Sequence, residues 1–103
     1  MDEITIHVMQ EDIDQGNPNY SNSCAIAKAA LRDLFLEEGT IHVSHTYLSV
    51  FSKNERGLIE GTTCYDLPWE ATQFITRFDE GEAVEPIKFI ATKTKEWETR
   101  IDE

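Results

Sequence analysis

Cys24 is the residue of this 103-residue chain with the greatest capacity for covalent chemistry, because it stands just before a segment with helical periodicity. A cysteine at a helix N-terminus meets the positive end of the helix dipole, which lowers the pKa of its thiol and suits a nucleophile. A nucleophile also needs a base and an oxyanion site, and the sequence identifies neither a histidine partner nor a nucleophile-elbow glycine pattern. We therefore interpret Cys24 as a side chain packed beneath the preceding loop, and we expect no enzymatic activity.

Two further groups have metal-binding side chains at unsuitable spacing. The segment 12–16 begins like an EF-hand loop, with aspartate first and third, but its fifth position is glycine and its twelfth is serine. His42 and His45 are three apart in a predicted strand, so they face opposite sides of the sheet. The sequence therefore predicts neither a metal site nor a cofactor.

Charge is the most informative bulk property of the chain. Its Asp and Glu residues number 20 and its Lys and Arg residues 9, which gives a formal net charge of −11 at pH 7. Binding to nucleic-acid phosphates needs Lys and Arg, so this balance argues against a direct nucleic-acid partner. It favours a basic partner, because a negative field attracts positively charged surfaces.

The acidic residues gather in three parts of the sequence. These are Glu11, Asp12 and Asp14 in the first loop, Glu37 and Glu38 at the expected end of the first helix, and Asp79, Glu80, Glu82 and Glu85 after the second. Each carboxylate at a helix C-terminus opposes the helix dipole by about 0.3–1 kcal/mol, so stability does not account for them. We interpret the groups either as a negative rim that imitates a row of phosphates or as an ordinary solvated face.

Hydrophobic periodicity predicts a β-α-β-β-α-β order in one α+β domain over residues 1–92. Alternating apolar residues predict strands, and apolar residues three and four apart predict helices. The predicted elements are a strand at 4–8, a polar loop at 11–22, a helix that ends at Gly39, a strand at 41–51 with a slip in its alternation, a strand at 58–65, a helix that ends at Gly81 and a strand at 87–92. Residues 93–103 are predicted to be a charged tail, either a short helix that contains Trp97 and Ile101 or frayed chain.

This element order is commonest in the ferredoxin-like arrangement. We accordingly expect a two-layer sandwich, with a four-stranded, mainly antiparallel sheet and both helices on one face. No basic leader followed by an apolar stretch is present, and no apolar run approaches the roughly 20 residues of a membrane span. The sequence thus predicts a cytoplasmic protein that does not bind a membrane.

Two segments resemble small phage and prophage proteins. The first combines the strand at 4–8 with Asp12-Ile13-Asp14-Gln15-Gly16 and Cys24-Ala25-Ile26-Ala27, where that family has an Asp-Ile-Xaa-Xaa-Gly turn and a Cys-Pro-Ile-Ala helix start. The second runs from Leu67 to Pro86, and Ala25 departs from the pattern because the family usually has proline there. The family is largely uncharacterised, so the resemblance implies a mobile-element origin and a fold. Small acidic phage proteins include anti-CRISPR and other counter-defence factors.

These observations predict a non-enzymatic phage or prophage protein, monomeric or dimeric, that inhibits a host defence protein such as a CRISPR effector. It would cover a basic nucleic-acid-binding surface with Glu11, Asp12, Asp14, Tyr20, Glu37, Glu38, Asp79, Glu80 and Glu82. Tyr20 belongs to this set because it lies in a polar loop, and tyrosine is frequent among interface hot spots. The alternative is a small homodimeric structural or regulatory module that pairs through an apolar sheet face.

Overall fold

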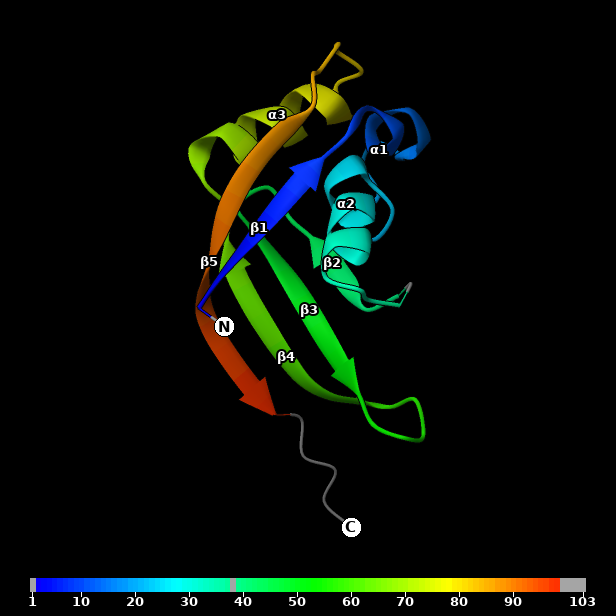
Figure 1. The fold of residues 1–103 in the computed structure, drawn as a ribbon, viewed down its shortest axis with the longest axis vertical. Coiled ribbons are helices and arrows are strands. Elements are labelled where there is room, and N and C mark those ends of the chain that lie inside the picture. The colour runs from blue at the N-terminus through cyan, green and yellow to red at the C-terminus, as the bar shows by residue number, and fades with distance from the viewer. Residues whose placement is uncertain (1, 38, 99–103) are drawn as a thin grey trace.

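The computed structural model describes residues 2–37 and 39–98, which form five β-strands and three α-helices (Figure 1). In chain order these are β1 (Glu3–Val8), α1 (Gln10–Gln15), α2 (Ala25–Asp33), β2 (Ile41–Val43), β3 (Tyr47–Lys53), β4 (Ile59–Asp66), α3 (Trp69–Asp79) and β5 (Ile87–Glu98). The α+β class that the periodicity predicts is confirmed.

The long strand β5 holds the sheet together because it pairs with two other strands. Residues 87–92 of β5 are antiparallel to β1, and residues 92–98 are antiparallel to β4. The strand order is β1-β5-β4-β3-β2, with every neighbouring pair antiparallel. The register shifts between Cys64 and Tyr65, and the curled sheet extends along the longest axis of a molecule that measures 49 × 23 × 21 Å (Figure 1).

The register places the buried apolar side chains of the strands on a single face of the sheet. Ile6 lies opposite Phe89 in the β1–β5 half, and Leu48 lies opposite Tyr65 in the β3–β4 half. These four residues are buried in one cluster with the apolar sides of α2 and α3, which contribute Ile26, Ala27, Ala30, Phe74, Ile75 and Phe78. The two longer helices therefore share one core with one face of the sheet.

The sheet does not have the expected four strands or the ferredoxin-like order. That order puts the first strand inside the sheet, whereas β1 lies at an edge and pairs with β5 alone among the described strands. The segment expected to be one strand at 41–51 is two strands, β2 and β3. They are joined by a turn in which the N–H of Ser44 donates to the carbonyl of Tyr47 at 2.8 Å. This turn causes the slip in the alternation.

Residues 93–98 are the second half of β5 and not a tail or a helix, so that part of the prediction is wrong. The stretch forms a strand although it has little apolar alternation. Its backbone pairs with β4, and backbone hydrogen bonds do not depend on which side chains are present. Ile101, the other residue on which the expected helix depended, lies outside the described residues.

The first predicted helix is shorter than expected, and it ends at Asp33 instead of reaching Gly39. Phe35 takes the left-handed conformation that normally favours glycine, with φ at 55°, and the Leu36 N–H donates to the Leu31 carbonyl at 2.9 Å. The Phe35 side chain is consequently 94% exposed. The polar loop expected at 11–22 also contains a short helix, α1.

The second predicted helix is confirmed as α3, with Pro68 at its N-cap and Gly81 in the left-handed conformation beyond its end. Ala71, Phe74, Ile75 and Phe78 form its buried side, as the spacing predicts. Among the helices that the structure describes, none has the length and apolar character needed to cross a membrane.

Candidate partner-binding surface and adjoining pocket

One end of the molecule carries exposed carboxylates from two segments that are distant in sequence. Because Val8 pairs with Ile87, the chain enters α1 and leaves the α3–β5 loop (residues 80–86) at the same end of the sheet (Figure 1). The exposed acidic residues of these two segments, which we name the acidic end, are Glu11, Asp14, Glu80, Glu82 and Glu85. The fold thus brings together two of the three acidic groups seen in the sequence.

The acidic end has little compensating positive charge. Glu11 lies 3.6 Å from Arg32, but that guanidinium is bound more closely to Asp12 and also contacts Asp33. Within the part of the chain that the structure describes, the other four members of the acidic end form no ion pair. The surface therefore keeps most of its negative field.

Glu80 and Glu82 are neighbouring carboxylates on the α3–β5 loop, and Glu82 affects the ionisation of Glu80. A hydrogen bond with Glu82, and then the repulsion of the Glu82 charge, raise the pKa of the exposed Glu80 carboxyl above its ordinary value. Like charges held side by side cost stability, so folding alone gives no reason to keep this pair. A basic partner would relieve the repulsion.

Asp12 does not belong to this surface, although the sequence placed it there. It is 5% exposed, and its two carboxylate oxygens accept hydrogen bonds from the Met9 N–H at 2.8 Å and from Arg32 Nη1 at 2.7 Å. The first bond caps the start of α1, and the second fixes α1 against α2. Asp12 is therefore a structural residue, whose partner lies too far along the chain for the local sequence to indicate it.

The group expected around Glu37 is not part of the acidic end. Glu37 is exposed in the loop between α2 and β2, and its carbonyl accepts the Thr40 hydroxyl at 2.5 Å. Figure 1 shows this loop near the middle of the long axis, apart from α1 and the α3–β5 loop. Glu38 lies outside the described residues. The single continuous rim suggested by the sequence is thus reduced to one end of the molecule.

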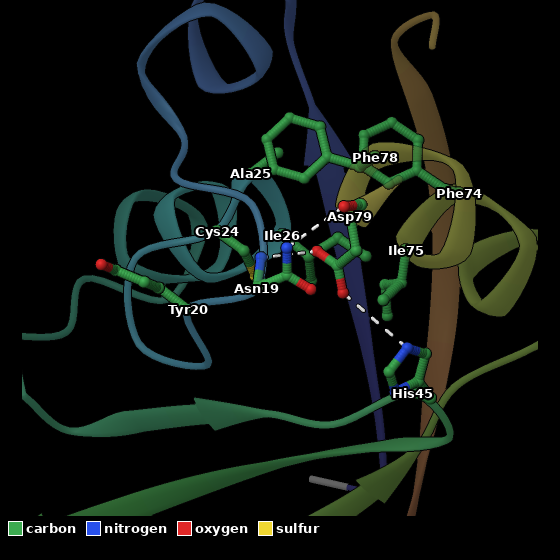
Figure 2. A pocket seen from close by; sticks show the side chains of 10 residues that line it. All are labelled: Asn19, Tyr20, Cys24, Ala25, Ile26, His45, Phe74, Ile75, Phe78 and Asp79. Carbon is green, nitrogen blue, oxygen red and sulfur yellow. Dashed lines mark hydrogen bonds and ion pairs between the residues drawn. The ribbon is translucent and has the colours of Figure 1, made fainter. Parts of the chain in front are cut away.

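Asp79 is half-buried at the end of α3, where it connects the loop between α1 and α2 to the body of the protein. Its Oδ1 accepts the backbone N–H of Asn19 at 2.8 Å, and the Asn19 amide donates to the Asp79 carbonyl at 3.1 Å. Its Oδ2 faces His45 Nε2 at 3.7 Å (Figure 2). Asp79 therefore differs from its exposed neighbours in being positioned by specific contacts.

A pocket opens beside Asp79, and we name it the α2–α3 pocket. Its cavity of about 120 Å³ is lined by Asn19, Tyr20, Cys24, Ala25, Ile26, His45, Phe74, Ile75, Phe78 and Asp79 (Figure 2). Six of these are buried apolar residues from α2, its N-cap and α3, whereas His45 and Tyr20 are exposed. Tyr20 points away from the other lining side chains (Figure 2). The pocket has an apolar interior and a polar, partly acidic mouth.

Cys24 lies in this apolar interior, at the N-cap of α2. Burial raises the pKa of its thiol, and this effect outweighs the backbone N–H groups of Ala27 and Ile26, which favour the thiolate. The sequence led us to consider a lowered pKa, so this is a correction. Cys64 is the other free cysteine, and its sulfur lies 3.3 Å from the Ser49 hydroxyl. The environment of Cys24 does not favour a nucleophile.

Sequence reasoning did not identify the α2–α3 pocket, because its lining comes from four separate segments. His45 is its clearest omission, since we considered that residue only as a metal ligand. Comparison of the chain with family models, with curated proteins and with solved structures finds no match. The functional argument therefore depends on the geometry and charge of these two neighbouring features.

Proposed function

We propose that this protein acts without catalysis, as an inhibitor that places its acidic end against a basic nucleic-acid-binding surface of a partner protein. In the setting that the family resemblance implies, the partner is a host defence protein, with a CRISPR effector as the leading candidate. The observation that carries the proposal is the convergence of α1 and the α3–β5 loop, which gathers five exposed carboxylates at one end of the molecule, four of them without an ion pair to any described residue.

The chemistry of the acidic end suits a site that normally holds phosphates. Lys and Arg bind a row of phosphate charges without reading their identity, so a row of carboxylates can occupy the same groups. The charges of Glu80 and Glu82 repel each other, and a basic groove would relieve this repulsion. Charge complementarity of this kind mainly increases the rate of association and the specificity for one partner.

The alternative of a homodimer that pairs through an apolar sheet face receives less support. The register places Thr5, His7 and Lys88 on the face opposite the core, together with Asp66 and Thr92. Ile90 is an exposed apolar member of this face, but its cross-strand neighbour is Thr5. The β3–β4 half of this face carries Tyr47 and Phe51, which lie opposite Asp66 and Thr62. The apolar residues of the face thus have polar cross-strand neighbours, unlike the more apolar interfaces typical of obligate dimers.

The test is retention of proteins from nuclease-treated bacterial lysate on the immobilised protein, compared between two double variants. Glu80→Lys/Glu82→Lys reverses charge at the acidic end, whereas Glu55→Lys/Glu60→Lys makes the same change in the exposed β3–β4 hairpin. We expect the first variant to lose the retained partner and the second to keep it. Retention should also fall as salt rises from about 0.1 M to about 1 M, because screening shortens the reach of the charges.

The retained partner must then release the protein when its own nucleic acid is added. Displacement of the purified partner by an oligonucleotide, at constant ionic strength, supports occupation of a nucleic-acid-binding surface. Equal losses in the two double variants would contradict a role for the acidic end. Simultaneous binding of the oligonucleotide and this protein would contradict the mimicry.

A further inference from the structure

The size of the α2–α3 pocket limits what it can hold. Its volume of about 120 Å³ is well below the roughly 300–1,000 Å³ of sites that bury drug-sized ligands and cofactors. It is close to the roughly 150 Å³ of an engineered apolar cavity that accommodates benzene. The pocket is therefore of the right size for one side chain of a partner and too small for a typical metabolite.

The charge of the pocket differs between its interior and its mouth. Ile26, Phe74 and Phe78 supply an apolar interior, and the Cys24 thiol there is neutral because its pKa is raised. The mouth carries the Asp79 carboxylate, and Glu80, the first residue of the acidic end on the α3 side, follows it directly in the chain. An occupant that matches both parts has an apolar stem and a cationic head.

We infer that the α2–α3 pocket receives a lysine side chain of the partner, with its methylene stem between Ile26 and the α3 phenylalanines and its ammonium group at Asp79. Lysine commonly buries its stem against apolar surface while its charged head remains at the edge of water. This inference deepens the proposed function and depends on it, because it assigns the anchoring contact of the same basic partner.

The contacts of Asp79 favour lysine over arginine. The preferred carboxylate geometry for arginine is a fork that uses both oxygens together. Here Oδ1 already accepts the Asn19 N–H, while no described residue forms a hydrogen bond with Oδ2, whose contact with His45 at 3.7 Å is beyond hydrogen-bond distance. One oxygen is therefore available, and an ammonium group acts as a point charge that needs only one.

The experiment uses the wild-type protein and three glycine-rich peptides that differ only at a central residue. That residue is lysine, norleucine or 2,3-diaminopropionic acid. Lysine supplies both the methylene stem and the charge. Norleucine supplies the stem alone, and 2,3-diaminopropionic acid supplies the charge on a single methylene group. Binding is followed by NMR chemical shifts of Ile26, Phe74 and Phe78 for the pocket and of Glu80 and Glu82 for the acidic end. We expect the lysine peptide to shift both sets and to bind at least about tenfold more tightly than either of the others.

Each outcome separates the inference from the proposed function. If the lysine and diaminopropionic acid peptides shift only the acidic end, the inference is overturned while charge-based binding remains. If norleucine binds as tightly as lysine, the assignment of the ammonium group to Asp79 is overturned. Absence of pocket shifts with the lysine peptide also overturns it, and the proposed function is then judged by its own charge-reversal experiment.

A pair of variants on α3 provides the matched control. Asp79→Asn keeps an oxygen that can accept the Asn19 N–H but removes the charge, whereas Glu70→Gln removes a charge from the opposite end of the same helix. We expect the affinity for the lysine peptide to fall by about tenfold in the first variant and to stay unchanged in the second. Equal affinities in the two variants would contradict the inference.

Discussion

Asp12 and Asp14 belong to the same short helix, yet the structure gives them opposite roles. Asp12 is buried and bonded to Met9 and Arg32, whereas Asp14 is exposed and accepts a hydrogen bond from the Gln10 side chain at 2.9 Å. Two carboxylates with the same local sequence context therefore differ because only one meets a guanidinium from another helix.

Substitution of the two aspartates tests this difference. We expect Asp12→Asn to lower the free energy of unfolding by about 1–3 kcal/mol. The amide weakens the charge-assisted bond to Arg32 and leaves the guanidinium without its buried counter-charge. Asp14→Asn should leave the stability unchanged within about 0.5 kcal/mol. Urea unfolding followed by circular dichroism measures both free energies of unfolding. If Asp12→Asn also left the stability unchanged, Asp12 would not be a structural residue.

Phe35 combines an exposed aromatic ring with a backbone conformation that suits glycine. We expect Phe35→Gly to raise the free energy of unfolding by about 1 kcal/mol, because glycine relieves the strain at φ 55°. Phe35→Ala keeps the Cβ and hence the strain, and the ring it removes is 94% exposed, so its stability should stay near the wild-type value. Thermal unfolding of the two variants compares them, and a destabilised Phe35→Gly would contradict the strain.

At the level of elements, the end of α1 and the start of α2 contact each other at Gly16. A Cβ built on Gly16 would lie 2.6 Å from the backbone nitrogen of Ala25 and 2.7 Å from the carbonyl oxygen of Asp12. The end of α1 thus packs directly against the start of α2, and both contacts are with backbone atoms that cannot move aside. The close packing of Gly16 against Ala25 therefore requires a residue without a Cβ at position 16.

Substitution at this contact should be poorly tolerated. We expect Gly16→Ala to lower the free energy of unfolding by about 1–3 kcal/mol, because the added methyl forces α1 and α2 apart. Gln15→Ala changes an exposed neighbour in the same turn and should have little effect. Chemical denaturation of both variants measures the difference, and a stable Gly16→Ala protein would show that the helices can separate without cost.

Elements with strong periodicity could be predicted from the sequence, whereas elements defined by their partners could not. The apolar spacing of α3 and the alternation of β1 are intrinsic to those segments, and both were predicted within a few residues. The second half of β5 has no such pattern, since it is a strand only because β4 lies beside it. Charge composition indicated the acidic end, but no local signal indicated that Asp12 is buried or that four segments form a pocket.

Truncation after Thr92 tests the contribution of the second half of β5. We expect the shortened protein to lose cooperative unfolding and to aggregate, because β4 would become an exposed edge and the two halves of the sheet would separate. A tail of no structural importance would instead leave the fold intact. Dispersion of the NMR spectrum and a concentration series by light scattering distinguish the two results.

At the level of the whole molecule, the net charge of −11 should oppose folding in dilute buffer. We expect the urea midpoint to rise as NaCl increases from about 0.1 M to about 1 M, because the Debye length falls from about 10 Å to about 3 Å. The double variant Glu80→Gln/Glu82→Gln should show a smaller rise, since it lacks the repulsion between the Glu80 and Glu82 charges. A midpoint that falls with salt would indicate that attractive ion pairs dominate.

The position of β5 also has a consequence for biosynthesis. β1 is synthesised well before its sole partner in the described sheet, residues 87–92, because the other described elements lie between them in the sequence. Until then the nascent chain exposes the apolar side of β1, and closing so long a loop slows folding. We therefore expect the β1–β5 pairing to form only after residues 87–92 have been translated, with chaperones able to bind β1 in the interval.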